Sequence, residues 1–142
     1  MDGIWMEIEP KQRNRPDSEK VTINLGYVDL GQIDLLVGEG FYSNRSDLIR
    51  TAIRNQLGTH TETIRQASAR KTLVLGLQEI TRADLEALRS AGKTMHIRAL
   101  GLARIASDVT PELALATIES VRVLGALQAS PAVRAALADR IR

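Results

Sequence analysis

The sequence predicts an α+β protein built in two parts from its 142 residues. The first part, residues 19–58, combines one short strand with two helices per chain, and we expect an intermolecular two-stranded ribbon. The second part, residues 72–142, is expected to be an α/β domain of three short strand-helix repeats. Two observations predict this fold. Residues 20–25 alternate strictly ahead of two helical patterns, and a Leu-Gly dipeptide recurs at intervals of 25 and 24 residues.

The predicted strand has one apolar and one polar face, because a period of two sends successive side chains to opposite sides. The apolar face carries Val21, Ile23 and Leu25, and the polar face carries Lys20, Thr22 and Asn24. A lone strand leaves both of its edges unpaired, so the simplest partner is the same strand of a second copy. The ordinary alternative is an edge strand with a solvated outer face.

Two helical patterns follow the strand. Asp29 with Gln32 predicts a capping box at the start of the first helix, and Gly40 predicts its end in a left-handed conformation. Ser43 is the expected N-cap of the second helix. Each helix carries an apolar stripe that is expected to meet the strand of both copies. The expected dimer core consists of Val21, Ile23, Leu25, Ile33, Val37, Ile49 and Ile53.

The start of the second helix is a candidate anion site. Backbone N–H groups without helical acceptors and the positive end of the helix dipole meet there. Side chains add donors and one charge, from Ser43, Asn44, Arg45 and Ser46. The plain alternative is an N-cap next to a solvated arginine.

Residues 20–57, which contain KVTINL and FYSNRSDLIRTAI, resemble the MetJ/Arc/CopG-like ribbon-helix-helix DNA-binding proteins. The resemblance implies a dimer whose ribbon enters the major groove of DNA, while the corner before the second helix holds the phosphate backbone. Base contacts are then expected from Lys20, Thr22 and Asn24, and phosphate contacts from Ser43, Asn44, Arg45 and Ser46. Asn can pair bidentately with adenine, Thr can reach a thymine methyl, and Lys can reach guanine.

Two segments outside these parts are polar. Residues 1–18 lack periodicity and are expected to form a flexible arm. Its cations Lys11, Arg13 and Arg15 can lie along DNA phosphates or in a minor groove, and a solvated tail is the equal alternative. Residues 59–71 are expected to be a linker.

The second half repeats around its glycines. Alignment on Gly76, Gly101 and Gly125 superposes TLVLGLQEI, IRALGLARI and VRVLGALQA. We expect close backbone packing at these glycines and parallel strands, each followed by a helix that starts at a Thr or Ser cap. The leucines that precede the glycines, Leu75, Leu100 and Leu124, are expected to share one core, and the open strand edges to join further copies. Chance self-similarity in a segment rich in Ala and Leu is the alternative.

Composition excludes several classes of function. The chain has no cysteine, and its two histidines lie in different segments, so we expect neither a disulfide framework nor a metal site. No nucleotide-binding or hydrolase motif is present, so we expect no cofactor and no catalysis. No apolar run reaches the length of a membrane span.

Residues 1–58 carry a net charge of −2 (seven Lys and Arg against nine Asp and Glu), and residues 59–142 carry +4 (twelve against eight).

The sequence therefore predicts a bacterial homodimer that binds double-stranded DNA sequence-specifically as a transcriptional regulator, most often a repressor. It is expected in the cytoplasm, associated with the nucleoid. Higher oligomers are expected through residues 72–142, which can also bind a protein partner. The alternatives are an antitoxin of a toxin-antitoxin operon, and a DNA-organising or plasmid-transfer structural protein that polymerises through the repeats.

Overall fold

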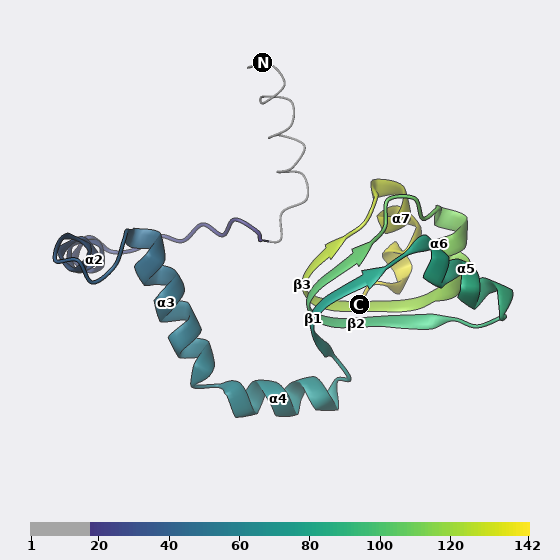
Figure 1. Cartoon of the computed structure of the whole chain (residues 1–142), viewed down its shortest axis with the longest axis horizontal. Helices are drawn as coiled ribbons and strands as arrows, with labels where there is room; N and C mark the ends of the chain where they lie inside the picture. Colours follow the sequence, from purple (N-terminus) through teal and green to yellow (C-terminus); the bar gives the residue numbers. More distant parts are fainter. Residues whose placement is uncertain (1–17) are drawn as a thin grey trace, which may run out of the picture. The chain divides into compact units, whose positions relative to one another are not determined.

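The computed structural model describes residues 18–142 of the chain (Figure 1). The chain divides into two compact units at residue 61, with the second unit spanning Glu62–Arg142. Each unit has its own local architecture. The cations predicted for a DNA-binding arm, Lys11, Arg13 and Arg15, lie outside the described residues.

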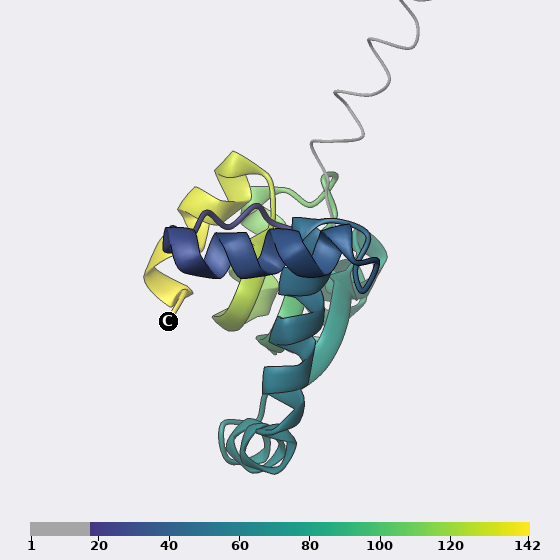
Figure 2. The ribbon, with the colours of Figure 1, turned by 90° about the vertical axis from the view of Figure 1, so that its left-hand side faces the viewer.

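The first unit contains an extended segment and two helices. Residues 18–26 run as an extended trace into helix α2 (Tyr27–Gly38), and helix α3 (Arg45–Gly58) follows after a turn (Figures 1 and 2). The segment predicted as a strand has no hydrogen-bonded partner strand among the described residues. Residues 20–25 therefore form no strand within one copy, and their pairing with a second copy stays a prediction.

Helix α2 begins earlier than predicted. Gly26 is its N-cap and makes no side-chain cap, so the capping box predicted from Asp29 and Gln32 is wrong. Asp29 instead lies in the first turn, where its charge favours the helix dipole. The predicted end is confirmed. Gly40 has a φ of +88°, and the N–H groups of Gly40 and Phe41 donate to the carbonyls of Val37 and Leu36, a Schellman motif.

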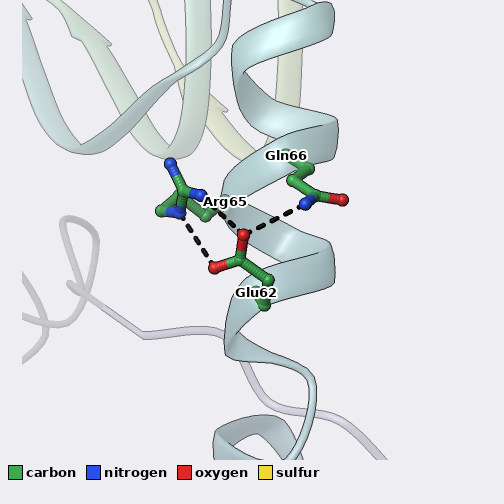
Figure 3. A network of polar contacts seen from close by, with 3 residues as sticks. All are labelled: Glu62, Arg65 and Gln66. Carbon is green, nitrogen blue, oxygen red and sulfur yellow. Dashed lines mark hydrogen bonds and ion pairs between the residues drawn. The ribbon is translucent and has the colours of Figure 1, made fainter.

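The predicted linker contains a helix, α4 (Thr61–Arg70). The Arg65 guanidinium forms two hydrogen bonds with the Glu62 carboxylate, at 3.0 Å and 2.5 Å, and the Gln66 amide donates to it at 3.0 Å (Figure 3). These bonds lower the pKa of Glu62. Pairs three and four residues apart stabilise a helix by about 0.2–0.5 kcal/mol each, so these contacts favour α4 locally.

The second unit contains a parallel sheet in the order β1-β2-β3 (Figure 1). Its strands are β1 (Val74–Ile80), β2 (Met95–Ile105) and β3 (Ile118–Gln128). The helices that follow them are α5 (Arg82–Ser90), α6 (Pro111–Thr117) and α7 (Pro131–Ala136), and a short 3-10 helix, η1 (Ala138–Arg140), comes last. The three predicted helix starts are confirmed, since Thr81, Thr110 and Ser130 each accept a cap hydrogen bond from the backbone.

The three aligned glycines occupy neighbouring positions across the sheet, with Gly76 beside Gly101 and Gly101 beside Gly125. All three have a positive φ, between +120° and +138°. A Cβ on Gly101 would lie 2.5 Å from the Gly76 carbonyl oxygen, and one on Gly125 would lie 2.0 Å from that of Gly101. The prediction of close backbone packing at these glycines is confirmed, and we call this row the glycine rung.

The leucines that precede the glycines are not in the core, which corrects the sequence-based prediction. Leu75 is 76% exposed and Leu124 is 47% exposed, while Leu100 is partly exposed. The core is formed by the opposite face of the sheet and the helices, and it includes Ile80, Leu85, Ile97, Ala99, Ala103, Ile105, Leu113, Ile118, Val121, Val133 and Leu137. Successive side chains of a strand alternate between faces, and the helices cover only one of them.

The glycine rung should tolerate no side chain at its inner positions. Gly125→Ala is expected to lower the stability of the second unit by more than the roughly 1–3 kcal/mol of backbone strain, because its Cβ also overlaps the Gly101 carbonyl. Chemical unfolding followed by circular dichroism measures this loss.

Gly76→Ala is the matched control, since Gly76 has almost the same φ, +120°, but nothing lies within 4 Å of its Cβ position. Gly76→Ala should lower the stability of the second unit only by the cost of the backbone strain. Equal losses in the two variants would contradict the steric role of the rung.

Candidate nucleic-acid interface

The extended segment presents its polar and apolar side chains to solvent in the single chain. Val21 is 77% exposed and Ile23 is 57% exposed, although both belong to the predicted apolar face. The predicted base-reading residues are exposed as well, and they are Lys20, Thr22 and Asn24. The candidate interface therefore starts from a segment of which neither face is covered.

The helices of the first unit bury no residue completely. Of the predicted dimer core, Ile33, Val37 and Ile49 are half-buried, whereas Ile53 is 52% exposed. A module of this size is stable only when its apolar side chains leave water, so one copy of it leaves its own core unfinished. The predicted core residues are therefore not covered within one copy, and their burial between two copies stays a prediction.

The N-terminus of α3 is organised by two reciprocal hydrogen bonds. The Asn44 side chain accepts from the Asp47 N–H at 2.8 Å, and the Asp47 carboxylate accepts from the Ser43 N–H at 2.9 Å. The N-cap is therefore Asn44, and the prediction of Ser43 is wrong by one residue. The spacing of Asn44 and Asp47, three residues apart, could have indicated this cap from the sequence.

This arrangement leaves two backbone donors pointing out of the helix. The N–H groups of Arg45 and Ser46 have no acceptor within residues 18–142, because they belong to the first turn. Together with the exposed hydroxyls of Ser43 and Ser46, they form a surface that can hold an oxygen anion. The Asp47 carboxylate lies in the same turn and opposes an anion there.

Arg45 makes an ion pair that the sequence analysis missed. Its Nε and Nη2 donate to the two carboxylate oxygens of Asp34 in α2, at 2.8 Å and 2.9 Å. The hydrogen bonds hold the pKa of Asp34 below its ordinary value and raise that of Arg45. The pair links α2 to α3 and orients the guanidinium. The two residues are 11 positions apart in the sequence, and no local pattern predicts their contact.

Three other cations of the first unit make no ion pair with any described residue. They are Lys20, next to the predicted base-reading positions, and Arg50 and Arg54 on α3. All three side chains are exposed. The unit therefore offers free positive charge to a polyanion although its carboxylates outnumber its cations.

Neither histidine gathers metal ligands. His60 lies 3.5 Å from the Gln56 amide, and His96 contacts Ser120 and Glu119 at 2.6 Å and 3.1 Å. No group of three His, Cys, Asp or Glu side chains within residues 18–142 is placed to hold a metal ion. The helices in the described part of the chain are also too short or too polar to cross a bilayer.

Comparison with known proteins defines the class to which this geometry belongs. The model of the ribbon-helix-helix transcriptional regulator family matches residues 16–134, so the match includes both units. The chain belongs to this family, and it is a DNA-binding regulator. Members of the family bind DNA as dimers. No curated protein and no solved structure is significantly similar to the chain.

The ion pair between α2 and α3 can be tested by titration. Asp34 has a lowered pKa, so its carboxylate and the pair persist at neutral pH and are lost as the pH falls through the lowered value. Arg45→Gln should raise the pKa of Asp34 toward 3.8, measured by NMR of its carboxyl carbon. Arg50→Gln, on the same helix but without a contact to Asp34, should leave the pKa of Asp34 unchanged. A similar shift in both variants would show that the pair is absent in solution.

Proposed function

We propose that this chain is a homodimeric, sequence-specific repressor whose paired residues 20–25 read the major groove of DNA. The observation that carries the proposal is the uncovered alternating segment in a unit that buries no residue of α2 or α3. Two copies of the segment can pair as an antiparallel ribbon narrow enough for the groove. The same pairing brings Val21, Ile23 and Leu25 of both copies against the four helices.

The polar face of this ribbon would select the DNA sequence. Asn24 can pair bidentately with adenine, and Thr22 can contact hydrogen-bonding groups or a thymine methyl. Lys20 can reach guanine or a nearby phosphate. Since these side chains are exposed and make no hydrogen bond to any described residue, no intramolecular contact must break when they bind.

The corner before α3 would hold the phosphate backbone on each side of the ribbon. Arg45 has five N–H donors, and its bidentate bond to Asp34 uses two of them, so three remain for a phosphate. The ion pair thus orients the guanidinium next to the free N–H groups of Arg45 and Ser46. Asp34 becomes a positioning residue of the proposed interface, while Ser43 and Asn44 contribute polar contacts.

The proposed role of the second unit is assembly of DNA-bound dimers. Its parallel sheet has side chains that the unit itself leaves exposed, and it shares the family match with the first unit. Regulators that contact neighbouring sites gain affinity from the linkage of their binding events. This role makes the protein a repressor that can cover more than one site.

The two kinds of DNA contact should be separable by mutation. Asn24→Ala should lower the affinity for DNA selected by the wild-type protein by about 1–3 kcal/mol for each subunit of the dimer, with little change on random DNA. Arg45→Ala should weaken binding to both DNAs and reduce the salt dependence by about one counterion for each subunit of the dimer. Fluorescence titrations at several salt concentrations measure both effects.

Asn55→Ala provides the control for Asn24, since Asn55 is an exposed residue of α3 outside the proposed contacts. It should bind like the wild type. If Asn24→Ala and Arg45→Ala weaken both DNAs equally, the division between base reading and phosphate binding is wrong.

A substitution in the proposed dimer core should unfold the first unit and not merely weaken its binding to DNA. Ile23→Lys places a charge in the proposed core, so the helices of the first unit should lose their structure and DNA binding should vanish. Thr22→Lys, one residue away on the polar face, should keep the dimer and its helices. Helix content by circular dichroism and mass by light scattering distinguish the variants. A folded Ile23→Lys dimer would overturn the proposed ribbon.

A further inference from the structure

One member of the glycine rung has a conformation for which the unit supplies no reason. Beside Gly101 and Gly125, the space of the missing Cβ is occupied by the carbonyl oxygen of the preceding glycine of the rung. Gly76 has a similar φ, +120°, but nothing lies within 4 Å of its Cβ position. A glycine inside a strand often marks the close approach of another backbone. Gly76 therefore has the conformation that receives a carbonyl oxygen, and none of the described residues provides one.

Gly76 belongs to β1, which forms an open edge of the sheet (Figure 1). Its carbonyl points toward β2. Backbone groups of successive residues alternate in direction, so those of Leu75 and Leu77 point outward, where they bond to no described residue. Val74 is 61% exposed, whereas its neighbour Ala99 on β2 is fully buried. The outer side of β1 thus lacks both hydrogen-bonding partners and apolar contacts among the described residues.

The opposite edge of the sheet, on β3, carries a carbonyl that fits this position. Gly101 directs its carbonyl at Gly125. Gly125 has almost the same φ as Gly76, +121°, so we expect its own carbonyl to point away from β2, past the free edge of β3. One edge of the unit therefore has an empty place in the rung, and the other edge has a carbonyl to fill it.

We propose that β1 of one copy pairs in parallel with β3 of a second copy, so that the glycine rung continues from one chain into the next. Gly76 then lies beside Gly125 of the second copy and receives its carbonyl oxygen. The pairing is head-to-tail, because it joins two different edges of the unit. This inference rests on the assembly role proposed above and names its surface and its partner.

The register that aligns the glycines also matches the side chains. With Gly76 beside Gly125, residues 74–79 lie beside residues 123–128 of the second copy. The resulting neighbours are Val74 and Val123, Leu75 and Leu124, Leu77 and Ala126, and Glu79 and Gln128. Three of these rows join apolar side chains, and no row brings like charges together.

The same register preserves the contacts that already cover part of β3. The Arg142 N–H donates to the Val121 carbonyl at 2.8 Å, and Val121 precedes the stretch that would pair with β1. The Leu127 carbonyl accepts a hydrogen bond from the Arg134 guanidinium. A carbonyl oxygen has two lone pairs, so this one can also accept the Glu79 N–H of the second copy. The pairing therefore requires none of these hydrogen bonds to break.

Disulfide formation between full-length copies tests the register. The chain has no cysteine, so Leu77→Cys in one preparation and Ala126→Cys in another introduce the only thiols. In the proposed pairing their Cα atoms lie about 4.8 Å apart, the spacing of neighbouring strands. This distance lies within the range that a disulfide spans. Oxidation of the mixed chains should therefore yield a disulfide-linked heterodimer.

The controls use the same thiols in other combinations. Each variant oxidised alone should remain largely unlinked, because the pairing brings together two different positions. A mixture of Leu77→Cys with Leu124→Cys shifts one thiol by two residues, about 6.5 Å along the strand, so its yield should be several-fold lower. Equal yields from the matched and shifted mixtures would overturn the register. Leu77→Cys chains that link efficiently to one another would overturn the head-to-tail pairing.

Gly76→Ala tests the rung itself. Its Cβ would fill the space that the carbonyl of the second copy needs, so species larger than a dimer should disappear in light scattering. In dilute solution, where the units are apart, its stability should fall only by the strain described above. Gly92→Ala is the control, since Gly92 also has a positive φ, +66°, and open space at its Cβ position, but lies between α5 and β2. A Gly76→Ala protein that assembles like Gly92→Ala would contradict the proposal.

The outcomes separate this proposal from the function on which it rests. If the matched thiols do not link but light scattering of the wild type shows species above a dimer, the edge pairing is wrong and the assembly role uses another surface. If the wild type forms only dimers, the assembly role fails too. Binding of Gly76→Ala to a single DNA site reports separately on the ribbon and should match the wild type.

Discussion

The need to bury apolar side chains is the constraint on which the structure depends. The first unit buries none of the residues of α2 and α3, and it exposes Val21 and Ile23 on a segment that has no partner strand among residues 18–142. Burial of apolar area is the main favourable term in folding, and a unit of this size cannot supply it from one copy. Dimerisation is therefore a condition of the fold in the proposed regulator. The proposed DNA recognition follows from the same condition, because the proposed pairing covers one face of the segment and presents the other.

The second unit buries the apolar side chains on one face of its sheet only. Helices cover the face that carries Ile97 and Ala103, whereas the leucines beside the glycine rung remain exposed. The rung explains how so regular a face arises. Each glycine allows the close approach of the next strand, and the rows on either side then fall into register. Both units thus leave apolar side chains exposed within one copy.

Charge in the first unit is local. Its carboxylates outnumber its cations, yet Asp34 is engaged with Arg45, and Asp47 is engaged with the Ser43 N–H. The exposed cations Lys20, Arg50 and Arg54 remain without an ion pair to any described residue. DNA responds to the potential at the contact surface and not to net charge, since screening limits the reach of each charge to about 10 Å. In the proposed interface, the Asp34 carboxylate therefore orients Arg45 toward a phosphate while it lowers the net charge.

The sequence by itself determined the features that depend on neighbouring residues. The stop at Gly40 and the caps at Thr81, Thr110 and Ser130 each act over a few positions, and local geometry controls them. The structure decided what depends on contacts between distant segments. Asp34 meets Arg45 only after a turn joins two helices, and Leu75, Leu100 and Leu124 are exposed only because the helices cover the other face. A period of two separates the faces of a strand, but it cannot say which face the rest of the chain will cover.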